Sequence, residues 1–193
     1  MKHLKMFLIV VFAMATSLVF ASTAFATYAT SPAGTIYTGT LAGTSEGHVI
    51  WDTPIMQFEC NFSMEGKIEV HGAGVTGQGK ATNYTYKECN SNIVIHTVKT
   101  GTLEIHSAGK GVGTITSSGT EGRATLLSFG IECVYSTNNT DLGVVTDSSI
   151  TGGPATLDLS ATVPRTGGSA FCGTSATLTA AAVVNTPEEV FID

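Results

Sequence analysis

Two short phrases of the sequence each place a glutamate and a histidine two residues apart. The first, IEVHGAG, contains Glu69 and His71, and the second, LEIHSAG, contains Glu104 and His106. Residues at positions i and i+2 of a strand lie on the same face. If the two strands are neighbours in register, two carboxylates and two imidazoles would suit zinc or another divalent ion. This is the sharpest chemical hypothesis that the sequence offers, and it implies a metal-dependent hydrolase.

The same phrases also have a purely structural interpretation. Ile68 and Val70 alternate with the first polar pair, and Leu103 and Ile105 alternate with the second. Strands with one buried face and one face in water show this alternation. The pattern therefore predicts two half-buried strands, and the metal site depends on whether the two histidines face each other across a shared sheet surface.

The composition after residue 26 predicts an all-β fold. Thr, Val, Ile, Ser and Gly dominate, whereas residues that favour helices are sparse. Short alternating runs separated by glycine-rich turns are typical of a β-sandwich or a flattened barrel of short antiparallel strands. The expected strands are 35–42, 47–51, 55–63, 66–71, 81–87, 92–98, 101–106, 112–116, 123–136, 142–146, 155–163, 175–184 and 189–192. The expected turns are Glu65-Gly66, Gly77-Gln78-Gly79, Thr100-Gly101, Gly152-Gly153-Pro154 and Thr166-Gly167-Gly168.

One strand is expected to be central in the sheet. The run NIVIHTV is apolar on both faces, with Val94, His96 and Val98 on one side. A strand that is apolar on both faces is usually covered on both.

The N-terminus has the pattern of a secretory signal peptide. Lys2 and Lys5 precede an apolar run, MFLIVVFAMATSLVF, and Ala24-Phe25-Ala26 provides a small-x-small cleavage site. The run is shorter than the span of about 20 residues that crosses a membrane. We therefore expect a signal peptide at 1–26 and a single all-β domain at 27–193. We expect no transmembrane segment in the mature chain, which would be secreted, extracellular or displayed at the cell surface.

The charge balance excludes one class of partner. The chain has 9 Lys and Arg against 15 Asp and Glu, and without Lys2 and Lys5 the net charge is near −8. No Lys/Arg-rich run exists, so the chain lacks the basic surface that nucleic-acid binding requires. The partner is not identified by the sequence, and a cell-envelope or extracellular polymer or protein is the expected class.

The four cysteines predict two disulfides. Cys60, Cys89, Cys133 and Cys172 all follow the signal peptide, and an even count in an exported chain indicates a disulfide framework. Three pairings are possible. The sequential pairing, Cys60 with Cys89 and Cys133 with Cys172, is preferred.

The cysteine strands also suggest two related halves. FECNFS at 58–63 resembles IECVYS at 131–136, and CNSNIVI at 89–95 resembles CGTSATL at 172–178. The order strand, cysteine, turn, strand, cysteine, strand thus occurs twice.

Three further stretches carry a resemblance to a known group. ECVYSTNNTDLGVV, ATLDLSATVPRTGGSAFCG and the closing VNTPEEVFID resemble the second half of uncharacterised exported bacterial proteins of the actinobacterial type. A looser likeness, on SPAG and the Cys/Gly/Thr patterning, is to secreted proteins of the alkane-oxidation-activator and biofilm type. The resemblance implies an exported, disulfide-bonded β protein and carries over no reaction and no catalytic residue.

The remaining residues point away from catalysis. No nucleophile elbow or phosphate loop is present, no thiol is left free, and no cofactor is expected. Trp51 is the one candidate for stacking on a sugar or docking a partner, and packing in the core is its alternative role. We therefore expect a non-enzymatic structural or surface-interaction module, with a carbohydrate or small-ligand binding module as the alternative. The terminal EVFID is either an unpaired edge for strand addition or a strand that closes the fold.

Overall fold

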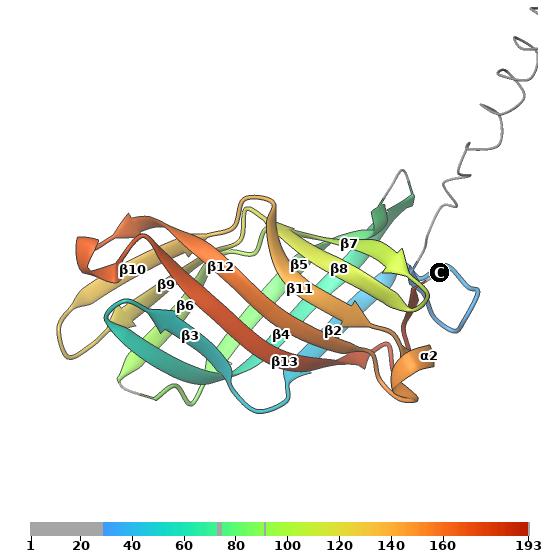
Figure 1. Ribbon diagram of the computed structural model, residues 1–193, viewed down its shortest axis with the longest axis horizontal. Helices are drawn as coiled ribbons and strands as arrows, with labels where there is room; N and C mark the ends of the chain where they lie inside the picture. Colours follow the sequence, from blue (N-terminus) through green and yellow to red (C-terminus); the bar gives the residue numbers. More distant parts are fainter. Residues whose placement is uncertain (1–28, 73–74, 91, 193) are drawn as a thin grey trace, which may run out of the picture.

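Four long strands run the length of the molecule in the computed structural model, which describes residues 29–72, 75–90 and 92–192 (Figure 1). These strands are β4 (Met56–Gly72), β5 (Val75–Lys87), β12 (Thr156–Gly168) and β13 (Ser175–Thr186). The predicted signal peptide lies outside the described residues. The all-β fold class is confirmed.

Most of the other strands of the barrel wall come in pairs, in which two consecutive short strands lie end to end and together form one line of the wall. The bounds of the four pairs are β2 (Gly39–Ser45) and β3 (Val49–Thr53), β6 (Ile93–Lys99) and β7 (Thr102–Gly109), β8 (Val112–Ser118) and β9 (Glu121–Leu126), and β10 (Ile131–Ser136) and β11 (Thr140–Thr146). Within each pair the chain keeps its direction, because β7 pairs with β8 while β6 pairs with β9. The eight resulting lines of strand follow one another in chain order.

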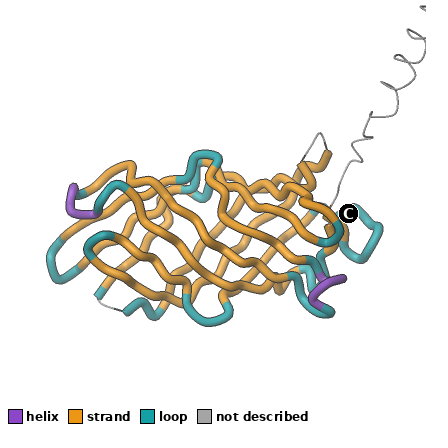
Figure 2. The backbone as a smooth tube through the Cα atoms, viewed as in Figure 1, coloured by secondary structure: helices purple, strands orange, loops and turns teal. Residues whose placement is uncertain are grey.

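Backbone pairing closes this sheet into a flattened barrel (Figure 2). The last line, β13, pairs with β12 on one side and with both β2 and β3 on the other. The strands β2 and β3 also pair with β4, so the first and last lines meet. The predicted flattened barrel is therefore the observed architecture, although four of its strands are longer than expected.

The wall has a gap in its ladder between β5 and β6. Among the described residues, β6 pairs only with β9, and a single side-chain bond spans the gap, from Thr97 Oγ1 to the carbonyl oxygen of Tyr84 at 3.3 Å. The expectation that 92–98 is a central strand is thus wrong, and His96 is exposed. The apolar inner face of β6 covers the barrel interior, while its edge beside β5 forms no backbone ladder among the described residues.

Along each line of the wall, every second side chain points into the barrel, and these side chains fill its interior. In β8 the buried residues alternate with half-buried ones, and Ile115 and Ser117 point inward. One cluster of buried side chains lies around Phe58 and Cys133, and a second lies around Val145 and Leu157. Half-buried Leu142 packs against both clusters, so the core is continuous.

A short ribbon covers the end of the barrel where the described chain begins and ends, called here the terminal end. There β1 (Ala29–Thr30) pairs with β14 (Phe191–Ile192), next to helix α2 (Ser148–Thr151). The buried Asp147 caps α2 with Oδ1 and accepts the Ile192 N–H on Oδ2 at 3.0 Å. The terminal EVFID therefore closes the fold in this structure and is not an unpaired edge.

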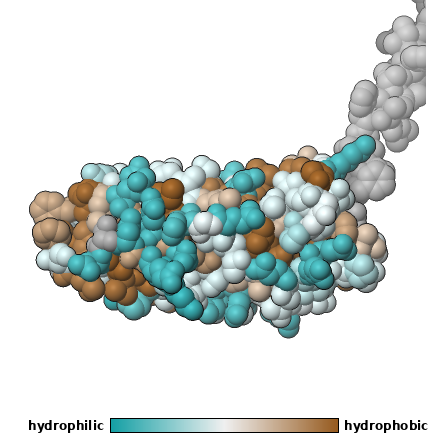
Figure 3. Space-filling model, turned by 90° about the horizontal axis from the view of Figure 1, so that it is seen from below, coloured by the Kyte–Doolittle hydropathy of each residue, from teal (hydrophilic) through white to brown (hydrophobic). Residues whose placement is uncertain are grey.

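The opposite end, called here the disulfide end, holds both cystines. Cys60 is bonded to Cys89, and Cys133 is bonded to Cys172 in the 3-10 turn η1 (Ala170–Cys172), so the preferred sequential pairing is confirmed. The first bond joins β4 to the loop after β5, and the second joins β10 to the turn after β12. Figure 3 shows apolar side chains gathered at this end of a face that is otherwise mixed. The exposed apolar residues of its turns are Ile55, Leu127, Phe129 and Phe171.

Several predicted boundaries are wrong. The expected turns Glu65-Gly66 and Thr166-Gly167-Gly168 lie inside β4 and β12. The expected strand 123–136 is two strands joined by a turn at 127–130, which the apolar residues Leu127 and Phe129 disguise. The expected turn at Gly77-Gln78-Gly79 lies inside β5. A β-carbon on Gly79 would collide with the backbone oxygen of Lys67 on β4, so this glycine permits close strand approach.

Removal of either disulfide should destabilise the barrel strongly. The bonds close loops with sequence separations of 29 and 39 residues. In the chain-entropy model each contributes about 3–4 kcal/mol. The Cys60→Ala/Cys89→Ala and Cys133→Ala/Cys172→Ala variants should each lose about that much free energy of unfolding in urea titrations. A loss below about 1 kcal/mol would show that the reduced chain is already constrained at this end.

Candidate functional site: the barrel interior

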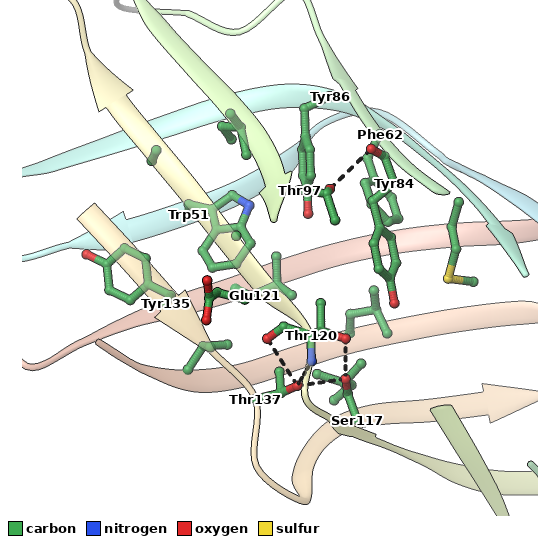
Figure 4. Close-up of a pocket in the computed structure, with 18 of the residues that line it drawn as sticks. Trp51, Phe62, Tyr84, Tyr86, Thr97, Ser117, Thr120, Glu121, Tyr135 and Thr137 are labelled. Carbon is green, nitrogen blue, oxygen red and sulfur yellow. Dashed lines mark hydrogen bonds between the residues drawn. The ribbon is translucent and has the colours of Figure 1, made fainter. Parts of the chain in front are cut away.

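A cavity of about 110 Å³ lies inside the barrel, in the half nearer the disulfide end. Leu157, Val163 and Leu178 form part of its aliphatic wall. Its aromatic lining residues are Trp51, Phe58, Phe62, Tyr84, Tyr86 and Tyr135 (Figure 4). Protein interiors seldom leave voids larger than a water molecule. A void of this size in a closed barrel is therefore a candidate binding site.

A second cavity of about 60 Å³ continues toward the terminal end. It shares Met64, Leu103, Ile115 and Leu157 with the first cavity and reaches Val190 beneath the terminal ribbon. The two spaces together form an elongated apolar interior along the barrel.

Trp51 faces this interior from β3. Its ring stacks on Phe58 with centroids 6.2 Å apart and lies 6.3 Å from the ring of Tyr135. The indole Nε1 is buried and has no hydrogen-bond partner among the described residues. The structure thus places the predicted ligand-binding residue in a cavity wall and not on an exposed platform.

Tyr84 and Tyr86 face the cavity from β5 and contact Phe62, with ring centroids 6.0 and 5.1 Å from it. Burial raises the pKa of both hydroxyls, and the proximity of Tyr84 raises the pKa of Tyr86 further. A hydrogen bond with the Thr120 side chain opposes the shift in the pKa of Tyr84. In Figure 4 the Tyr86 hydroxyl points into the cavity and has no dashed bond to the residues drawn.

A cluster of hydroxyls lies where three lines of the wall bend. Ser117 Oγ is 2.9 Å from both Thr120 Oγ1 and Thr137 Oγ1, and Thr120 Oγ1 donates to the Thr100 carbonyl at 2.9 Å. The Thr120 N–H donates to Thr137 Oγ1 at 3.0 Å. These bonds satisfy backbone groups that the bends release from the ladders. The cluster is saturated by its own contacts, so its role is structural.

The larger cavity contains no basic lining residue. Among its lining residues the only carboxylate is Glu121, whose Oε2 is 3.0 Å from Nζ of the exposed Lys99. An anionic ligand would find no cation inside and would lose its hydration. The lining therefore favours neutral ligands.

The second Glu-x-His pair forms a local network on the outer face of β7. His106 Nε2 lies 3.4 Å from Glu104 Oε2 and 3.5 Å from Thr116 Oγ1. Gln78 on β5 donates its amide N–H to Glu104 Oε1. Leu103 and Ile105 face the interior, as the alternation predicted.

The first pair is not on a neighbouring strand, because β5 separates β4 from β7. Gln78 occupies the position between the two lines, opposite both Val70 and Glu104. Glu69 is exposed, and the side chain of His71 lies outside the described residues. In the part of the chain that the structure describes, no three His, Cys, Asp or Glu side chains could hold a metal ion. The four-residue metal site remains a prediction.

The sequence analysis did not identify the tyrosines and hydroxyls of the cavity. A signal for Tyr84 and Tyr86 exists in NYTYK, where aromatic residues at alternate positions indicate an inward face. Ser117, Thr120 and Thr137 have no comparable signal, because Ser and Thr occur throughout the chain.

Comparison with protein-family models, curated proteins and solved structures finds no match for this chain. Within the described residues no helix is long and apolar enough to cross a membrane. The two disulfides fit a protein that functions outside the reducing cytoplasm.

The buried tyrosines should make the barrel sensitive to alkali. The pKa of Tyr86 is raised in the folded state, so between pH 10 and that higher value the unfolded chain loses a proton that the folded chain keeps. The free energy of unfolding should then fall as pH rises, by roughly 1 kcal/mol per pH unit for this group. Urea titrations from pH 8 to 11 should show a shallower fall for Tyr86→Phe. Equal slopes in both proteins would contradict this assignment.

Proposed function

We propose that this chain is an exported β-barrel protein that binds a small, mostly apolar molecule in its interior. The observation that carries the proposal is the pair of adjacent cavities lined mainly by aromatic and aliphatic side chains. Barrels of eight strands either fill with side chains or leave room for one small ligand. The second arrangement fits the voids found here.

The size of the cavity limits the ligand. An engineered apolar cavity of about 150 Å³ in another protein stays dry and binds benzene. A cavity of about 110 Å³ next to a smaller one of about 60 Å³ suits a ring of similar size or a short chain. A sugar chain is a poorer fit, because the lining offers few polar groups.

The gap between β5 and β6 gives the interior an access route. Tyr84 and Tyr86 on one side and Ile95 and Thr97 on the other line both the gap and the cavity. Opening the wall here breaks the side-chain bond of Thr97 and no backbone ladder. Opening elsewhere would break paired strands, so passage at this gap needs the smallest disruption.

The proposal also states that the protein is exported, that it is not an enzyme, and that its ligand comes from outside the cell. The signal-peptide pattern of residues 1–26 and the two disulfides support export. A binding protein needs no catalytic set, and the cavity residues are neutral aromatic, aliphatic and hydroxyl groups apart from Glu121.

Trp51 is the only tryptophan, so its fluorescence reports on the cavity directly. Benzene should change the Trp51 emission saturably and raise the melting temperature, since a ligand that binds only the folded state stabilises it. Ala124→Phe should weaken benzene binding at least about tenfold, because the new ring occupies the void. Ala124→Leu is the milder filling variant if the larger ring disturbs folding.

The matched control is Ala181→Phe, which makes the same substitution at an exposed position of β13. It should bind benzene as the wild-type protein does. No saturable benzene binding to the wild-type protein, or equal weakening in Ala124→Phe and Ala181→Phe, would refute the proposed function.

A further inference from the structure

For two hydrogen-bond donors in the cavity wall, no partner is found among the described residues. The indole Nε1 of Trp51 is buried without a partner among the described residues. The hydroxyl of Tyr86 lines the same cavity, and none of the hydrogen bonds found among the described residues involves it. Buried donors are almost always paired in folded proteins, so the unpaired indole N–H beside this hydroxyl calls for an explanation.

The other polar groups of the cavity do not share this property. Tyr135 donates its hydroxyl to the Cys172 carbonyl at 3.0 Å, and the Thr120 side chain is a hydrogen-bonding neighbour that lowers the pKa of Tyr84. Ser117 and Thr137 are bonded to each other. The two unsatisfied donors therefore stand out within one lining.

Their placement is compatible with a shared acceptor. Trp51 pairs across the wall with Phe58 on β4, and Tyr86 pairs with Phe62 on the other side of the same strand. Figure 4 shows the indole nitrogen directed to the side of Tyr86 and away from Ser117, Thr120 and Thr137. The two donors thus face one part of the cavity from opposite sides of β4.

A water molecule is a poor substitute for that acceptor. An ordered interior water normally has two to four polar partners, about three on average. The rings nearest the two donors are those of Phe58, Phe62 and Tyr135. The Thr97 side chain lies beside Tyr86 in Figure 4, and its hydroxyl already donates to the Tyr84 carbonyl at 3.3 Å. The hydroxyl cluster nearby is occupied by its own bonds.

We propose that the ligand is a small neutral carbonyl compound, such as a ketone, aldehyde or ester, whose oxygen accepts from Tyr86 and Trp51. This inference rests on the proposed function and adds the chemical class of the ligand. A carbonyl oxygen has two lone pairs and can accept both bonds. A carboxylate is excluded, because no Lys, Arg or His lines the larger cavity and Glu121 lies at its wall.

Three probes of one shape separate these possibilities: cyclopentyl methyl ketone, isopropenylcyclopentane and cyclopentanecarboxylate. They differ in having a neutral acceptor, no acceptor or a charged one. Dissociation constants are measured at pH 7.5 by calorimetry or ligand-observed NMR for the wild-type protein, Tyr86→Phe, Trp51→Phe and the control Tyr135→Phe. The control removes a hydroxyl of the same cavity that is already bonded to the protein.

The ratio of ketone affinity to alkene affinity should fall about three- to tenfold in Tyr86→Phe and in Trp51→Phe, the range expected for one lost hydrogen bond. It should stay unchanged in Tyr135→Phe. The carboxylate should bind at least about tenfold more weakly than the ketone to the wild-type protein.

Two failures have different meanings. If neither the ketone nor the alkene binds, the proposed function itself is refuted. If the alkene binds but the ratio is the same in all four proteins, or the carboxylate binds as well as the ketone, the carbonyl assignment is overturned and the apolar binding site stands.

Discussion

The structure depends on one constraint, the closure of the wall where β13 meets both β2 and β3. A sheet that closes has no free edge at that point, and its inner face is removed from water without a second layer. Each strand therefore needs apolar side chains at alternate positions only, which suits a chain rich in Thr and Ser. The disulfides and the Asp147 cap hold the two ends, where the ladders stop and backbone pairing no longer constrains the chain.

The bends explain why such a barrel contains a void. Three of the four two-strand lines bend near the hydroxyl cluster, at 99–102, 118–121 and 136–140, and across the gap β5 forms no ladder with β6. At each bend the inward alternation is interrupted, and small hydroxyl side chains stand where larger apolar ones would fill the interior. Ser117 is almost fully buried yet contributes little volume. The polar bonds that stabilise the bends thus leave space between the aromatic wall and the opposite strands.

The sequence predicted the fold class and the cysteine pairing because both follow from local patterns. Alternation at Leu103 and Ile105 identified an inward face, and the spacing of the cysteines identified two equivalent bonds. The prediction failed where one residue type has two uses. Gly79 resembled a turn but permits close strand contact, and Phe129 resembled strand but lies in a turn. The cavity had no local signal, because a void is a property of side chains from many strands at once.

The internal repeat clarifies how a site arises in one half only. FECNFS and IECVYS place Phe58 and Ile131 at matching positions of the wall, and likewise Phe62 and Tyr135. Trp51 lies opposite Phe58, and Leu126 lies opposite Ile131, so Trp51 and Leu126 occupy equivalent positions. Tyr86 lies opposite Phe62, and Arg165 lies opposite Tyr135, so Tyr86 and Arg165 are also equivalent. Leu126 has no donor, and Arg165 gives its donors to the carbonyls of Gly168 and Gly173. At the equivalent positions of the second half, the hydrogen-bond donor is therefore either absent, as in Leu126, or already bonded, as in Arg165. Related halves of one wall can share a scaffold while only one of them retains free donors, and the unpaired edge of β6 lies in that same half.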